Sequence, residues 1–425
     1  MQLFRWLSIF LNNEANPIMT SLQSGPATGA GSTVLIDQPR VVDIASIERE
    51  LIALWKAASD ADRDGVSTVT RACSMNLLVV ADAEPGIEEI GAMVGEVAIV
   101  HPGRIFMIVL DRTSARTGLD AWVSARCSLP APGRNQVCCE EITIKARGAD
   151  TGKVASIVTS LLVSDVPIVV LWKSTINLRD PLMVELFRIA DRVLVDTSEQ
   201  LEPQQVLRDW GRAVVGEWSG GNGQASGAGG RVVAAFGDLS WSHLTPWRTL
   251  LAHVFDPQEM RPMLKSISQI DLSYSSTTIP LHSGLGQSLL LVAWLAGRLG
   301  WIVDQPMCPG DGNSFRATLR RDQRGGPIEI RIGQVPARPG APGAIESVSL
   351  KAGAVFHLRL RAEAEVGTVA VERILGGGRV EESVHTFMPS LEAALVAKEL
   401  DILHRDALYE GSLHSLLDLL REGQS

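Results

Sequence analysis

The sequence is poor in the residue patterns that mark secreted and metal-binding proteins. Its five cysteines have no regular spacing, and Cys138 and Cys139 are adjacent. We therefore expect no disulfide framework, reduced thiols at both adjacent positions and a cytoplasmic location. A redox role for Cys139 stays open. The eight histidines lack the spacing of metal ligands, so we expect no bound metal.

The sequence also lacks the common catalytic and cofactor-binding motifs. The segment Gly148–Val154 has the wrong spacing for a phosphate-binding loop and indicates a turn that enters a helix. The segment GLGQSL from Gly284 has no third glycine and follows no clear strand, which disfavours a dinucleotide site. Neither a zinc-protease motif nor a nucleophile-elbow motif occurs. We therefore expect no catalytic residue and no cofactor.

Charge and hydropathy exclude two further classes of partner. The formal net charge of −9 argues against nucleic acid as the main partner, because a polyanion is bound by a cationic surface. The apolar run Leu285–Trp301 is interrupted by Gln287, Ser288 and Arg298 and is too short to cross a bilayer. We expect neither nucleic acid nor a membrane to be bound.

Composition divides the 425 residues into two domains. Residues 1–42 hold a short apolar run followed by a stretch rich in Ser, Gly and Ala, and we expect a disordered extension rather than a signal peptide. The segment 219–230, SGGNGQASGAGG, predicts a flexible linker. It separates an N-terminal domain, 43–218, from a C-terminal domain, 231–425.

The pattern of apolar residues predicts a mixed α/β and α+β protein, in which each domain has a sheet flanked by helices. In the first domain, strands at Leu77–Val80, Ile105–Leu110 and Ile168–Trp172 alternate with helical stripes, as in an α/β sheet. The second domain is expected to hold a buried helix at Leu285–Leu299 and alternating strands from Ser314 to His385, followed by helix.

A carboxylate lies on an apolar face of one predicted strand. Alternation places Glu140 on the same side as Cys138 and Ile142. A buried carboxylate needs a partner, and Arg71, His101 or Arg104 could supply it. The hypothetical cluster consists of Arg71, Asn76, His101, Arg104 and Glu140. Such a cluster is more often structural than catalytic, but it could also form the site of a sugar-phosphate enzyme or sensor.

Arginines alternate with apolar residues in two predicted strands of the second domain. Arg316 and Arg320 oppose Phe315 and its apolar neighbours, while Arg359 and Arg361 oppose a second apolar set. If these strands are neighbours, one sheet face is cationic and could bind an acidic protein, a sugar phosphate or a polyanion. The alternative is a solvated face that nearby glutamates neutralise.

Two tryptophans and an arginine crowd the segment Gly237–Asp256. Ser242 or Thr245 is expected to cap a helix that buries Trp247, with Trp241 just outside it. Tryptophan and arginine are enriched at binding hot spots, which favours Trp241, Trp247 and Arg248 as partner contacts. Equally, both indoles could be core.

Several segments carry a resemblance to a known family. They are, in order, Arg71–Val80, His101–Arg104, Val137–Ile142, Ser164–Trp172, Asp191–Thr197, Gly237–Asp256 and Leu285–Trp301. On these segments the chain from about residue 43 onward resembles the OpcA family of glucose-6-phosphate dehydrogenase assembly proteins. It departs from the family at Gly103, where serine is usual, and at Lys173, where a second tryptophan is usual.

The resemblance implies a non-enzymatic partner protein. It implies binding to glucose-6-phosphate dehydrogenase, promotion of the assembly or active state of that enzyme, and support of NADPH supply through the oxidative pentose phosphate pathway. Trp241, Trp247, Arg248, Arg359 and Arg361 are then the expected partner-binding residues.

Overall fold

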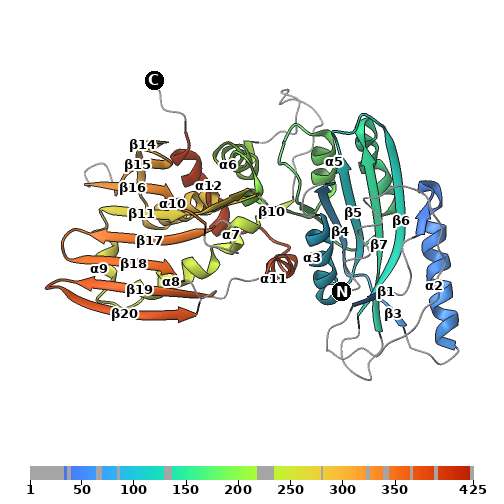
Figure 1. The fold of residues 1–425 in the computed structure, drawn as a ribbon, viewed down its shortest axis with the longest axis horizontal. Coiled ribbons are helices and arrows are strands. Elements are labelled where there is room, and N and C mark those ends of the chain that lie inside the picture. The colour runs from blue at the N-terminus through green and yellow to red at the C-terminus, as the bar shows by residue number, and fades with distance from the viewer. Residues whose placement is uncertain are drawn as a thin grey trace. The chain divides into compact units, whose positions relative to one another are not determined.

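The protein is described from a computed structural model (Figure 1). The structure describes residues 33–35, 40–63, 69–83, 87–128, 136–217, 234–278, 281–321, 326–337, 344–363, 367–386 and 391–421. The predicted linker, 219–230, lies outside them.

The chain forms two compact units, and each unit is built from segments that are not contiguous in the sequence. Unit 1 comprises residues 1–174, 185–191 and 392–401, and unit 2 comprises 175–184, 192–391 and 402–425. These units divide the chain elsewhere than at the predicted linker, so the predicted boundary stays a prediction.

Unit 1 is built on a mostly parallel sheet with the strand order β1-β6-β7-β5-β4-β8. The central strands β7, β5, β4 and β8 are parallel, whereas β6 pairs antiparallel with β7. Strands β1 and β2 pair with β6 inside the stretch that the sequence predicts to be disordered, because backbone pairing at a sheet edge does not depend on apolar side chains. The strands are β1 (Thr33–Leu35), β2 (Arg40–Val42), β3 (Val69–Arg71), β4 (Asn76–Asp82), β5 (Arg104–Asp111), β6 (Gly118–Ser128), β7 (Gln136–Arg147) and β8 (Ile168–Trp172).

Helices accompany this sheet, as expected for strands that are apolar on both faces. The predicted cap at Asp43 is confirmed, since its side chain accepts a hydrogen bond from Ala45 N. The helices are η1 (Ile44–Ser46), α2 (Ile47–Arg63), α3 (Ile87–Val100), η2 (Gly148–Lys153), α4 (Val154–Leu161) and α11 (Glu392–Leu400), together with α5 (Pro181–Ile189), which the two units share.

Unit 2 is built on an eight-stranded sheet with the order β14-β15-β16-β11-β17-β18-β19-β20 (Figure 1). Only the β11–β16 pair is parallel. The strands are β11 (Gln269–Tyr274), β14 (Ile302–Pro309), β15 (Ser314–Arg320), β16 (Pro327–Gln334), β17 (Ile345–Ala352), β18 (Phe356–Ala362), β19 (Thr368–Leu375) and β20 (Arg379–Thr386). In addition, β9 (Arg192–Val195) pairs parallel with β10 (Ala235–Asp238), while β12 (Ser276–Thr278) and β13 (Leu281–Ser283) form a two-stranded sheet of their own.

The core of unit 2 surrounds the helix α10. Its residues Leu289, Leu290 and Leu291 are fully buried, which confirms the expectation of a helix buried around most of its circumference. The predicted C-terminal helix is two helices, because the chain breaks before the cap residue Asp406. The helices are η3 (Thr197–Glu199), α6 (Pro203–Arg212), η4 (Ala213–Glu217), α7 (Leu239–His243), α8 (Thr245–Phe255), α9 (Arg261–Leu264), α10 (Gly284–Leu299) and α12 (Ala407–Leu419).

These elements confirm the predicted fold class of two mixed α/β domains. None of the helices in the described part of the chain is long and apolar enough to span a membrane.

The expectation of a reduced Cys138 is wrong. Cys138 forms a disulfide with Cys127, which lies directly opposite it in the antiparallel β6–β7 pair. Facing residues of antiparallel strands bring their side chains together, and this register cannot be read from the spacing of cysteines. The disulfide packs beneath α2 against Leu54 and Ala125. Cys139 is free and buried, as expected for the second of the adjacent pair.

We expect Cys138→Ala to lower the free energy of unfolding of the oxidised protein by about 2–4 kcal/mol, because a disulfide restricts the unfolded chain. Cys308→Ala, at an exposed free thiol, serves as the control and should change it by less than about 0.5 kcal/mol. Urea unfolding without reductant measures both. Labelling of all five cysteines in the denatured, unreduced protein would contradict the disulfide.

Candidate functional site

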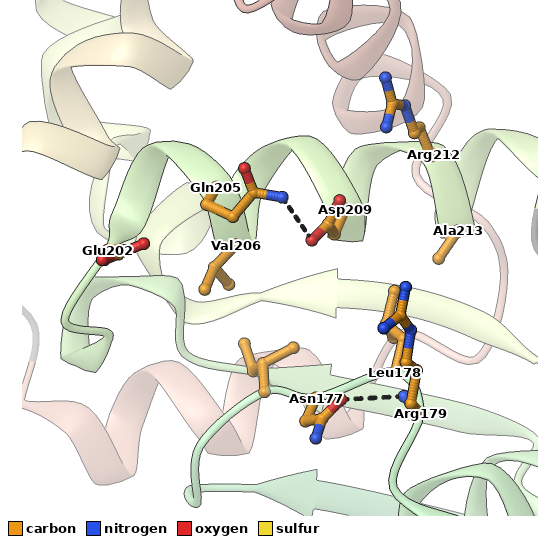
Figure 2. A pocket seen from close by; sticks show the side chains of 10 residues that line it. Asn177, Leu178, Arg179, Glu202, Gln205, Val206, Asp209, Arg212 and Ala213 are labelled. Atoms are coloured by element: carbon orange, nitrogen blue, oxygen red, sulfur yellow. Dashed lines mark hydrogen bonds between the residues drawn. The ribbon is translucent and has the colours of Figure 1, made fainter.

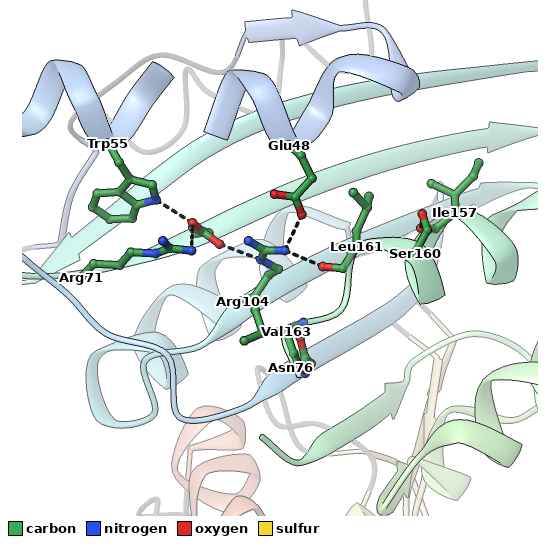
Figure 3. Close-up of polar contacts among 10 residues, drawn as sticks. Glu48, Trp55, Arg71, Asn76, Arg104, Ile157, Ser160, Leu161 and Val163 are labelled. Carbon is green, nitrogen blue, oxygen red and sulfur yellow. Dashed lines mark hydrogen bonds and ion pairs between the residues drawn. The ribbon is translucent and has the colours of Figure 1, made fainter. Parts of the chain in front are cut away.

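Glu140 is the centre of a buried cluster in unit 1, and Figure 3 labels its partners Trp55, Arg71 and Arg104. Its Oε1 accepts hydrogen bonds from Trp55 Nε1 and Arg71 Nη2, each at 2.6 Å, and its Oε2 accepts one from Arg104 Nε at 2.6 Å. The three donors come from α2, β3 and β5, so one carboxylate connects a helix to three strands. Two of the three partners named from the sequence, Arg71 and Arg104, are therefore confirmed.

Arg104 extends the cluster beyond Glu140. Its Nη1 donates to Glu48 Oε1 at 2.7 Å and to the carbonyl oxygen of Leu161 at 2.5 Å. Burial alone would lower the pKa of Arg104, but the carboxylates of Glu140 and Glu48 outweigh it and raise that pKa. The guanidinium therefore stays charged and holds α2 and the end of α4 together.

Two of the predicted members lie outside this cluster. Asn76 bonds both backbone groups of Val163, with Nδ2 2.9 Å from its oxygen and Oδ1 2.8 Å from its nitrogen. His101 follows the end of α3, and its Nε2 lies 3.7 Å from Asp401 Oδ1. Asn76 thus fixes a loop, and the expectation that His101 pairs with Glu140 is wrong.

The arrangement is suited to fastening elements rather than to catalysis. Three donors occupy both oxygens of Glu140, and Arg71 also lies over the ring of Trp55, 5.5 Å from its centroid. A general base needs an oxygen aimed at a substrate. A cluster whose carboxylate is fully engaged by the protein gives the sugar-phosphate alternative no support.

The sequence reasoning missed a second buried ion pair next to the first. Arg126 Nε donates to Glu141 Oε2, and both side chains are buried. Burial would lower the pKa of Arg126, but Glu141 raises it. The available signal was that β7 is apolar on both faces, so that Glu140 and Glu141, which point to opposite sides, both need a cation. A Cβ at Gly95 would lie 2.8 Å from Arg126 Nη1, so a larger residue there would require this guanidinium to shift.

Cys139 is poorly placed for redox chemistry. Burial raises the pKa of its thiol to about 11. Since the thiolate is the reactive form, the thiol is inert near neutral pH. The proposal of a redox role for Cys139 gains no support from this environment.

The tryptophan-rich segment is part of the core of unit 2. Trp241 is 3% and Trp247 4% exposed. Trp241 Nε1 donates to Asp406 Oδ2 at 2.9 Å, and the guanidinium of Arg248 lies 3.5 Å from the centroid of the Trp241 ring. The burial of both indoles gives the prediction that they contact a partner no support, and Arg248 is held against one of them. The burial of Trp247 with its helix face, predicted as the alternative, is confirmed.

The predicted helix cap in this segment is wrong. The turn of helix begins earlier, at Leu239, and Asp238 caps it by accepting from Ser240 N at 2.9 Å. Thr245 is the first residue of α8, which has no side-chain cap. Aspartate ranks with serine as a cap residue, so sequence preference alone does not decide between them.

Asp238 also anchors the C-terminal helix. Its Oδ2 accepts from Thr197 Oγ1 at 2.7 Å and lies 3.4 Å from the hydroxyl of Tyr409, which in turn accepts from Trp210 Nε1 at 2.8 Å. Desolvation raises the pKa of Asp238 to about 7, although the bonds from Thr197 and Ser240 oppose the rise. The carboxyl group of Asp238 therefore links η3 to α12 within unit 2, and its raised pKa lets it titrate near neutral pH.

The arginine strands share one face of the eight-stranded sheet but are not neighbours. Arg316 on β15 and Arg359 on β18 are separated by β16, β11 and β17. Arg359 Nη1 lies 2.9 Å from Glu372 Oε2 and Arg361 Nε 3.7 Å from Glu363 Oε1. The face is exposed and its charges are partly paired, as the solvated alternative predicts.

A pocket of about 750 Å³ lies between the loop Ile176–Arg179 and α6 (Figure 2). Arg179 and Arg212 are balanced there by Glu202 and Asp209. Equal numbers of both charges do not favour a phosphate ester. None of the residues predicted from the sequence lines this pocket.

Both halves of the chain match family models. Residues 94–212 match the glucose-6-phosphate dehydrogenase subunit N-terminal domain, and residues 234–413 match the corresponding C-terminal domain. The chain belongs to the OpcA family. The OpcA resemblance seen in the sequence is thereby confirmed.

Two cyanobacterial OpcA proteins show the extent of the likeness. The protein designated OxPP cycle protein OpcA in Synechocystis sp. is 26% identical over 388 residues, which cover 88% of this chain and 74% of that protein. Its counterpart in Synechococcus elongatus is 27% identical over 347 residues, covering 78% and 71%. A crystal structure of an oxidoreductase from Sinorhizobium meliloti has a TM-score of 0.42 and 11% identity over 80% of this chain and 86% of that one. So distant a likeness has no bearing on activity.

The structure shows the surroundings of the two residues at which this chain departs from the usual OpcA pattern. A Cβ at Gly103 would lie 2.6 Å from the carbonyl oxygen of Met75, so a serine here would require the backbone to shift. Lys173 is buried, and its Nζ pairs with Glu392 Oε1 at 2.8 Å. The lysine thus ties α11 to the end of β8 within unit 1.

We expect Glu140→Gln to lower the free energy of unfolding by about 3–5 kcal/mol, because it leaves the buried guanidinium of Arg104 without its main counter-charge. Glu372→Gln removes an exposed partner of Arg359 and should change it by less than about 1 kcal/mol. Urea unfolding of both variants tests this. Equal stability of the two would show that the cluster does not fasten α2.

We expect Asp238 to make the stability of the protein depend on pH. Its pKa is higher folded, about 7, than the 3.8 of the free group, so the folded state binds the proton more tightly. The resulting stability is full below about pH 4 and is lost as pH rises to about 7. Relative to Asp238→Asn, the wild type should lose stability between pH 5 and 7 and then level off, as followed by urea unfolding. A constant difference across this range would refute the raised pKa.

Proposed function

We propose that this chain binds glucose-6-phosphate dehydrogenase and promotes its assembly or active state without catalysing a reaction itself. The observation that carries the proposal is the match of both domains, in order, to glucose-6-phosphate dehydrogenase subunit models. The polar cluster that the sequence marked as a possible active site supports it too, because protein groups engage both oxygens of Glu140.

An activator of this kind must bind the active form of the enzyme more tightly than the inactive form, because only differential affinity shifts an equilibrium. The coupling is reciprocal: substrate that favours the active form should strengthen the complex. Support of NADPH supply would follow from the greater turnover of the dehydrogenase.

We place the contact on the open face of the eight-stranded sheet, around Arg359 and Arg361. Their side chains are 52% and 75% exposed, and their ion pairs with Glu372 and Glu363 are exposed as well. Exposed pairs are worth less than about 1 kcal/mol, so these guanidiniums can exchange their partners for acidic groups of another protein. Complementary charge of this sort accelerates and orients association.

Mixing the purified chain with the dehydrogenase of its own organism should give a complex in size-exclusion chromatography and raise turnover. Absence of both effects at micromolar concentrations would refute the proposed function. Arg361→Glu should slow association several-fold at low salt, because it reverses a charge on the contact face. Arg298→Glu, on α10, is the matched control. Equal effects of the two variants would refute the proposed contact face but would not contradict the proposed function.

A further inference from the structure

The two edges of the eight-stranded sheet differ in how they are protected. At one edge, the register of β14 against β15 shifts twice, between Val303 and Gln305 and between Gln305 and Cys308. This strand also contains Pro306 and Pro309. Bulges and prolines are the devices by which proteins keep an edge strand from pairing with another chain.

The opposite edge, β20, has none of these devices. All eight residues Arg379–Thr386 pair in continuous register with β19, and the strand contains no proline, glycine or lysine. Within the described residues, no strand pairs with its outer side (Figure 1). Seven of its eight residues are exposed, including Val380 at 50% and Val384 at 68%. A long, regular strand with exposed valines is a template for strand addition.

We propose that β20 pairs antiparallel with β20 of a second copy of this chain, which joins the two eight-stranded sheets. The sequence of the strand favours one register for this pairing. With the twofold axis at Ser383, Glu381 of each copy faces His385 of the other, and Ser383 faces Ser383. Val380 then faces Thr386 on the open side of the sheet.

Of the two neighbouring symmetric registers, the one with its axis at Val384 brings no carboxylate opposite an imidazole, and the one with its axis at Glu382 is disfavoured by charge. With the axis at Glu382, two carboxylates would face each other directly, which destabilises a strand pair. The register at Ser383 instead forms two contacts between a carboxylate and an imidazole. Glu381 is already oriented by Arg373 and Arg379, at 3.1 and 2.6 Å, and His385 lies 3.1 Å from Ser383 Oγ. The groups that would meet across the axis are thus held in place within each copy.

Disulfide trapping tests the register. In a Cys308→Ser background, which removes an exposed thiol, Ser383→Cys should form a covalent dimer under mild oxidation. Facing residues of antiparallel strands have Cα atoms about 4.5–5.5 Å apart, within the range of a disulfide. Glu382→Cys is the matched control and should crosslink weakly. Crosslinking of both variants to the same extent, or of neither, would overturn the proposed register.

Sedimentation velocity tests the pairing itself. The wild type should form a reversible dimer at micromolar concentrations. Val384→Glu should weaken it by about tenfold or more, because in this register the new carboxylate faces Glu382 of the other copy, whereas Ile302→Glu, an equivalent change on β14, should leave the dimer intact. A wild type that is monomeric at 100 µM, or equal effects of the two substitutions, would refute the proposal. A monomeric wild type whose Val384→Glu variant loses a dehydrogenase complex would assign the edge to the dehydrogenase and refute self-pairing too.

Discussion

The requirement that a buried carboxylate be matched by buried donors organises unit 1. Glu140 draws Trp55, Arg71 and Arg104 to one point, and these residues belong to elements that are far apart in the sequence. Removing a charge from water is costly unless hydrogen bonds and a counter-charge replace the water. The position of α2 on the sheet is therefore specified by polar geometry in addition to apolar packing.

Unit 2 repeats the same physical principle with a weaker acid. Asp238 is fully buried, but hydroxyl and amide groups surround it in place of arginines. Without a cation the burial raises its pKa, whereas Arg104 is kept charged by its carboxylates. The conspicuous tryptophans of this region serve that network: Trp241 holds Asp406, and Trp210 holds Tyr409. Their abundance reflects the fastening of α12 to the rest of the unit.

The periodicity of apolar residues was sufficient to predict most of the helices and strands. It predicted only some of the partners of Glu140. The strands β4, β5 and β8 were predictable because each is an apolar run between turns, and β7 because its residues alternate. Arg71 and Arg104 were predictable as partners because a carboxylate on an apolar face requires a cation. Which residues face each other across strands could not be predicted, because register and strand order are not contained in a sequence pattern. This applies to the Cys127–Cys138 pair, to the Arg126–Glu141 pair and to the separation of the arginine strands. The sequence likewise could not decide whether the indoles are buried in the core or available to a partner, since tryptophan is common in both settings.

The exchange of segments between the two units limits how the protein can be dissected. Helix α11, whose Val396 and Leu400 are buried and whose Glu392 neutralises Lys173, belongs to unit 1, although it follows all the sheet strands of unit 2 in the chain. A fragment that ended near residue 218 would contain the N-terminal family domain but would leave an ammonium group and apolar surface of unit 1 uncovered. The complementary fragment would lack β9 and α6 of unit 2. The boundaries of the two family models therefore differ from those of the compact units, and unit 1 requires residues 392–401 from the C-terminal part of the chain.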